Sequence, residues 1–189
     1  RDYVTSFTGR SCGTVNPTGN SIPQIQLEQN EYTIPVNTPF VLVASANDAD
    51  GDDLNYSWEQ LDSGGVAGAT ETAAELNADN GSNPLFRSIS PSLEAQRYFP
   101  QLANVLADNT SFGETYPSTE RELNFRLTVR DNNSGVNTVD TVVKVIANNN
   151  SFSVTIPDNS SNWQGNSQQL VSWDVADTHL SPVNCANVN

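Results

Sequence analysis

The sequence lacks any apolar run long enough to cross a membrane. A membrane-spanning helix needs about 18 or more consecutive apolar residues, and no stretch of the 189 residues approaches that length. A basic segment followed by an apolar one, the pattern of a secretory signal peptide, is also missing. The first residue is Arg1 instead of methionine. We therefore expect a processed or excised piece of a longer protein, with no membrane insertion.

Residues that bind zinc or act as catalytic bases are scarce. The chain has one histidine, His179, and two cysteines, Cys12 and Cys185. Zinc sites take most of their ligands from these residue types, in proteases often from a His-Glu-x-x-His motif, so we expect neither zinc nor enzymatic activity in this chain. The cysteines lie near opposite ends. A disulfide between them in an oxidising compartment and two separate thiols are both compatible with the sequence.

Basic residues are few as well. Eight Lys and Arg residues stand against 22 Asp and Glu residues, which gives a formal net charge of -14 and a pI near 4.1. Nucleic acids and anionic membrane surfaces repel such a polyanion, so neither is expected as a partner. Methionine is absent, whereas Asn, Ser and Thr are abundant, as is common in secreted bacterial β-proteins. We expect a secreted protein, extracellular or on a cell surface.

What the sequence does contain is a series of short segments with alternating apolar residues. Period-two alternation, rich in β-branched and aromatic residues and bounded by Asn, Asp and Gly, is typical of strands. In residues 123–129, four apolar residues alternate with three that should face outward: Asn124, Arg126 and Thr128. The other predicted strands are residues 24–27, 32–34, 40–46, 54–61, 84–89, 139–146, 152–156 and 169–175, with a strand and a helical turn over 97–106.

These segments divide the chain into four parts. They are a linker at residues 1–22, an antiparallel β-sandwich at 23–147, a second linker at 148–151 and a partial second β-domain at 152–189. The first linker is rich in Gly, Pro and polar residues, with one extended piece at residues 3–7. A long insertion, residues 62–121, interrupts the sandwich and is expected to hold a helical turn at 72–76. The last part is too short to enclose a core of its own.

Seven segments, taken in order, resemble a known family. They are ANDADGDDLNYSWEQ at 46–60, PLFRS at 84–88, YFPQL at 98–102, LNFRLTVRDN at 123–132, WQG at 163–165, VSWDV at 171–175 and PVNCANV at 182–188. The first resembles the second and third strands of PKD-like, immunoglobulin-like modules. Together they look like the region downstream of the catalytic domain in secreted bacterial reprolysin-like zinc metalloproteases. The resemblance implies an all-β, Ig-like (PKD-like) sandwich that is secreted and attached to a protease catalytic domain.

An acidic turn between two predicted strands is the best candidate for a binding site. Asp48, Asp50 and Asp52 are spaced two residues apart, and Gly51 permits a sharp turn. Carboxylates in such a pattern can converge on a hard cation such as calcium. In an Ig-like sandwich the loop after the sixth strand lies at the same end, which brings Asp131 to the turn as a further ligand. The alternative is a solvated turn whose aspartates bind their own backbone.

Aromatic residues have two expected roles in the sandwich. Trp58 should pack between the sheets, as a third-strand Trp does in many sandwiches. Four aromatic residues of the insertion either cap the core or form an exposed carbohydrate-binding platform, and we expect the core role: Tyr98, Phe99, Phe112 and Tyr116.

These observations predict a non-catalytic protein. Our first hypothesis is an accessory module of a secreted metalloprotease, which acts as a spacer, a stabiliser or a binder of a substrate surface, protein or polysaccharide. The alternative is a cell-surface adhesion module or a unit of a structural filament or stalk. Calcium is the one cofactor expected, and the catalytic domain of the parent protein is the first expected partner.

Overall fold

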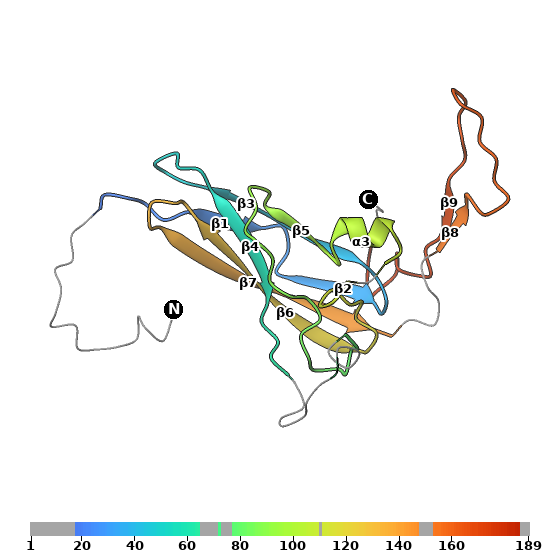
Figure 1. The fold of residues 1–189 in the computed structure, drawn as a ribbon, viewed down its shortest axis with the longest axis horizontal. Coiled ribbons are helices and arrows are strands. Elements are labelled where there is room, and N and C mark those ends of the chain that lie inside the picture. The colour runs from blue at the N-terminus through green and yellow to red at the C-terminus, as the bar shows by residue number, and fades with distance from the viewer. Residues whose placement is uncertain (1–17, 65–71, 73–76, 110, 148–152, 186–189) are drawn as a thin grey trace.

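The structure is a computed structural model that describes residues 18–64, 72, 77–109, 111–147 and 153–185 (Figure 1). The described residues form nine strands and one short helix. In chain order they are β1 (Gln24–Leu27), β2 (Glu31–Pro35), β3 (Phe40–Asn47), β4 (Asn55–Gln60), β5 (Gln96–Phe99), α3 (Leu102–Leu106), β6 (Arg121–Arg130), β7 (Val136–Ile146), β8 (Ser153–Ile156) and β9 (Ser172–Asp174). No helix in this part of the chain is long and apolar enough to cross a membrane.

Two sheets pack face to face. One has the strand order β1-β3-β5 and the other the order β2-β7-β6-β4. Neighbouring strands are antiparallel, as predicted for the sandwich, except for the one pair β2 and β7, which run parallel. The difference arises because the first two strands are divided between the sheets: β1 pairs with β3, whereas β2 joins the last strand of the sandwich on the opposite face.

The alternation along β6 predicts its buried face. Leu123, Phe125, Leu127 and Val129 are all fully buried, and they pack with residues of β3, β4, β5 and β7 in one core. Thr128 is an exception to the expected outward face, because it is only 8 % exposed. In the central strand, Thr128 lies in register between Ser57 and Thr138, and neighbours on both sides shield it from solvent.

The insertion completes the core. Its β5 and α3 form the strand and helical turn predicted over 97–106. No strand forms at 84–89, contrary to the prediction. The backbone N–H groups of Leu85 and Phe86 instead donate to the side-chain oxygen of Gln60, at 2.7 and 2.9 Å. Both side chains are at most 3 % exposed, so the apolar pattern marks a buried loop.

Aromatic rings fill the centre of the sandwich. Phe99 is fully buried, and its ring centroid lies 5.1 Å from those of Phe40 and Phe86 and 4.8 Å from that of Phe125. Trp58 is 3 % exposed, and its indole N–H donates to the Ala95 carbonyl at 3.1 Å. The core role predicted for Trp58 is therefore confirmed. Phe99 lies inside the core instead of capping it, whereas Tyr98 and Phe112 are 36 % and 50 % exposed and do not belong to the core cluster.

The last two strands form a separate two-stranded sheet. β8 covers the described part of the strand predicted at 152–156, and β9 is shorter than the strand predicted at 169–175. Val154 and Trp173 face each other across this sheet and are 53 % and 46 % exposed. The sandwich therefore does not cover these apolar side chains. Several predicted features lie wholly or largely outside the described residues: the extended piece at 3–7, Cys12, the helical turn at 72–76 and the linker at 148–151.

Candidate metal centre

The candidate site begins in the acidic turn that joins β3 to β4. The Asp48 carboxylate accepts the Asp50 N–H at 2.8 Å, and the Asp48 carbonyl accepts the Gly51 N–H at 3.4 Å. Gly51 has a φ of +80°, a conformation that a residue without a β-carbon adopts most easily. The local sequence thus curls the chain so that alternate aspartates face the same side.

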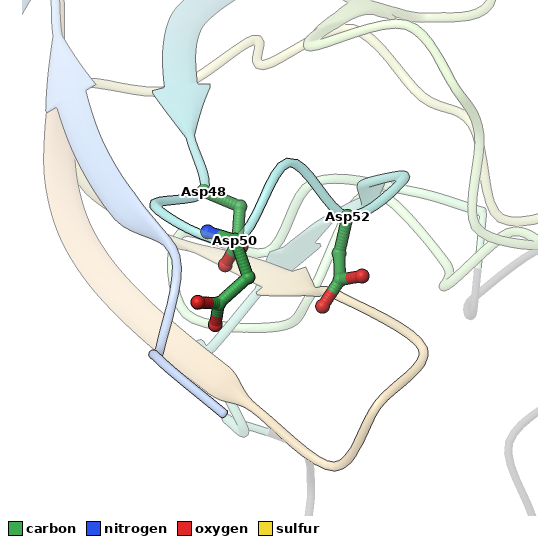
Figure 2. A group of neighbouring side chains, drawn as sticks. All are labelled: Asp48, Asp50 and Asp52. Carbon is green, nitrogen blue, oxygen red and sulfur yellow. The ribbon is translucent and has the colours of Figure 1, made fainter. Parts of the chain in front are cut away.

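Three carboxylates converge in this turn. One oxygen from each of Asp48, Asp50 and Asp52 lies within 4.8 Å of the others, and Figure 2 shows the three side chains directed to the same side of the turn. Calcium binds oxygen at about 2.3–2.6 Å, so a single calcium ion can contact atoms that are separated by this distance. Asp48 Oδ2 and Asp52 Oδ2 are buried and have no hydrogen-bond partner among the described residues.

Asp131 is not one of the convergent carboxylates. Its Oδ2 accepts the Asn20 side-chain amide at 2.7 Å, and its Oδ1 accepts the backbone N–H groups of Asn133 and Gly135, each at 2.8 Å. Asp131 is 1 % exposed. Burial raises the pKa of the Asp131 carboxyl, but these hydrogen bonds outweigh burial and hold that pKa below its ordinary value.

The role expected of Asp131 therefore differs from the one that the structure gives it. Its oxygens hold the loop between β6 and β7, and a β-carbon at Gly135 would collide with the Asp131 carboxylate. The expectation that the two loops adjoin is nonetheless correct. The Asn132 side-chain amide donates to the Asp53 carbonyl at 3.0 Å, and Asn55 donates to the Asn132 side-chain oxygen at 2.8 Å.

Two residues of the predicted first linker belong to this end of the molecule. The Ser21 N–H donates to Asp50 Oδ2 at 2.6 Å, and Asn20 reaches Asp131 as described. An open hollow of about 380 Å³ lies between this segment and the two loops; its lining residues are Thr18, Gly19, Asn20, Asp50, Asp52 and Asn133. No local sequence pattern marks Asn20, because its partner lies 111 residues away.

The strand order and the buried Trp58 on β4 define the class of protein: an all-β, immunoglobulin-like sandwich. No protein-family model matches the chain, and no curated protein does. One solved structure that resembles it is that of the fibronectin(III)-like modules of CbhA from Clostridium thermocellum, with 11 % sequence identity and a TM-score of 0.34. The match covers 67 % of this chain and 46 % of that one. A likeness this distant carries no functional argument, and the PKD-like assignment and the metalloprotease parent stay hypotheses.

Proposed function

We propose that this chain is a non-catalytic extracellular module of a secreted metalloprotease, a spacer or stabiliser whose acidic end binds calcium. The observation that carries the calcium site is a pair of buried oxygens, Asp48 Oδ2 and Asp52 Oδ2, that have no hydrogen-bond partner in the part of the chain that the structure describes. Burying an unpaired charged oxygen is unfavourable. A divalent cation beside several carboxylates offsets both that cost and their mutual repulsion.

The chemistry of the surrounding residues fits calcium. Asp48, Asp50 and Asp52 supply carboxylate oxygens, and the adjoining hollow is lined by further oxygen-bearing side chains, among them Asn20 and Asn133. Calcium takes six to eight oxygen ligands in flexible arrangements, whereas magnesium demands a tighter octahedral shell. An irregular group of oxygens on three chain segments therefore favours calcium.

Calcium at this position would stiffen the start of the sandwich. Asp50 Oδ2 already accepts the Ser21 N–H, and residues 18–22 lead directly into β1. An ion that fixes the acidic turn therefore also restrains residues 18–22, which are bonded to it through Ser21. A spacer benefits from such a fixed entry, because the direction in which a neighbouring domain extends is then defined.

The metalloprotease parent rests on the seven ordered segments, and secretion rests on the same resemblance together with the charge of -14. The coding sequence upstream of residue 1 tests this part of the proposal. A His-Glu-x-x-His motif there supports it, and a parent without a protease domain contradicts it.

A second candidate function is an adhesion or stalk module. The observation that favours it is the separate β8–β9 sheet, which follows the sandwich and exposes Val154 and Trp173. Consecutive β-domains are the building plan of such stalks. Tandem sandwiches on both sides of this chain in the coding sequence would support this function over the first.

The calcium site predicts a specific gain in stability. Calcium at a hundredfold excess over its Kd adds about 2.7 kcal/mol to the free energy of unfolding, which corresponds to a rise of several degrees in Tm. Asp50→Asn with Asp52→Asn should remove most of this gain and abolish the heat of calcium binding in calorimetry. Magnesium should have a smaller effect.

The matched control removes the same two charges elsewhere. Glu28 and Glu122 are exposed, so Glu28→Gln with Glu122→Gln should leave the calcium response unchanged. An equal Tm shift from sodium chloride at the same ionic strength, or an equal response in both double variants, would show that the effect is general screening of an acidic chain.

A further inference from the structure

The strand β5 forms an open edge of the first sheet. β5 pairs only with β3 in the sheet order, and the Ala44 N–H donates to the Ala95 carbonyl at 3.2 Å. Hydrogen-bonded and non-hydrogen-bonded pairs alternate along an antiparallel ladder. The main chains of Arg97 and Phe99 therefore face β3, and those of Gln96 and Tyr98 face away. No hydrogen bond joins these outward groups to any residue that the structure describes.

A groove of about 300 Å³ runs beside this edge. Most of its lining surface is apolar, and apolar side chains line it from β4 (Tyr56 and Trp58), from the insertion (Ile89) and from α3 (Leu102). Gln96 and Tyr98 of β5 also line it, and both side chains are exposed. The open edge and the groove are thus parts of one surface.

The opposite wall of the groove offers no comparable edge. The outward main-chain groups of Tyr56 on β4 are paired with Ser92, at 2.8 Å for the Tyr56 N–H and 2.9 Å for the Ser92 N–H. The Trp58 carbonyl accepts a guanidinium N–H of Arg97 at 2.7 Å. The insertion has therefore occupied the Tyr56 main chain and the Trp58 carbonyl, whereas the outward main-chain groups of both Gln96 and Tyr98 on β5 have no partner among the described residues.

We propose that this surface binds an extended peptide segment of a partner polypeptide, which adds as a strand to the edge of β5. Two residues of β5 present N–H and C=O groups in the spacing of a strand, and only another polypeptide main chain matches that row of donors and acceptors. The apolar groove then receives alternate side chains of the peptide. The proposal concerns a different face from the calcium site and holds for either parent protein.

The charge of the groove limits which kinds of peptide we expect to bind. Arg97 is paired with Glu114 at 2.8 Å, which leaves Glu94 as the one other charged residue in the lining. The whole chain carries a net charge of -14. We therefore expect neutral or basic segments to bind in preference to acidic ones. Since β5 has four residues, the bound segment is short.

The test uses fluorescent ten-residue peptides of random sequence as the probe, screened against the full chain by polarisation. Tyr98→Pro removes the outward N–H and spares the β3 ladder, because proline is tolerated where an edge N–H faces solvent. Tyr98→Thr is the matched control, since it removes the ring and keeps the N–H. Peptides selected on the wild type should bind the proline variant at least about tenfold more weakly than the threonine variant.

If Tyr98→Pro lowers the Tm, its weaker binding could reflect partial unfolding. Gln96→Pro and Gln96→Thr then repeat the comparison at the second outward position. Amide exchange at Gln96 and Tyr98 in the wild type gives a measurement without substitution, and bound peptide should slow it. The proposal is overturned if no peptide is selected, if the proline and threonine variants bind alike, or if exchange is unchanged. If a neutral oligosaccharide such as cellohexaose binds the wild type and the proline variants equally well, the groove is a sugar-binding site instead.

Discussion

Asp50 and Asp131 lie at the same end of the sandwich, but their surroundings give them different roles. Asp50 is exposed and shares a turn with two other carboxylates. Asp131 is buried and accepts three hydrogen bonds from neighbouring donors. Both oxygens of Asp131 already accept N–H groups, whereas Asp48 Oδ2 and Asp52 Oδ2 have no donor among the described residues. The residue type alone therefore does not distinguish a candidate metal ligand from a group that holds a loop.

Asp131 predicts a pH dependence of stability. Because its pKa is lower in the folded chain than in the unfolded one, its contribution is complete above the ordinary aspartate pKa of about 3.9. That contribution is lost as the pH falls through the folded-state pKa. Between pH 5 and pH 2 the wild type should therefore lose more stability than Asp131→Asn, measured by denaturant unfolding. Parallel curves for the two proteins would contradict the role given to Asp131.

At the scale of the elements, the register between β4 and β6 determines the core. Trp58 lies opposite Leu127, and Tyr56 opposite Val129. A shift of one residue would turn Trp58 outward, because side chains alternate between the two faces of a strand. Hydrogen bonds from Arg97 in the insertion to β4 also hold this register. Arg97, in the pair with Glu114, also donates to the Trp58 and Arg87 carbonyls.

The register predicts a large effect of truncating Trp58. Trp58→Ala should lower the free energy of unfolding by about 3–5 kcal/mol, the range for removing a large aromatic side chain from a core. Urea unfolding measures this loss. Trp58 fluorescence, in a background without Trp163 and Trp173, should be blue-shifted as in an apolar site. A loss under about 1 kcal/mol, or emission typical of water, would contradict the register.

At the scale of the whole molecule, the sandwich and the β8–β9 sheet differ in how well they bury their apolar residues. Residues of β3, β4, β5, β6 and β7 share one core. The β8–β9 sheet exposes Trp173, and Leu170 before it is 68 % exposed. Two strands without a packed face are marginal in water. We therefore propose that the sandwich folds on its own and that the β8–β9 sheet, within residues 153–185, needs further contacts to be stable.

Deleting residues 148–189 tests this division. The shortened chain should unfold in one cooperative transition at nearly the Tm of the full chain, because the described part of the deleted segment adds nothing to the core. Circular dichroism on heating, and the retained burial of Trp58, measure the outcome. A deletion that abolishes cooperative unfolding would show that the two parts form one domain.

The sequence by itself determined the features that depend on near neighbours. Period-two alternation located β3, β4 and β6 and the buried face of each, because successive side chains of a strand point to opposite sides. The acidic spacing located Asp48, Asp50 and Asp52, since a turn with Gly51 acts within a few residues. Trp58 was identified as a core residue for the same local reason.

Only the tertiary structure decided which distant groups meet. It brought Asn20 to Asp131, so that Asp131 holds a loop instead of joining the candidate metal centre. It satisfied Leu85 and Phe86 with the Gln60 side chain, where alternation predicted a strand. It also left the outward main chain of β5, beside a groove, without a partner among the described residues. A hydrogen bond between residues far apart in the chain depends on how the sheets pack. Local sequence patterns do not determine that packing.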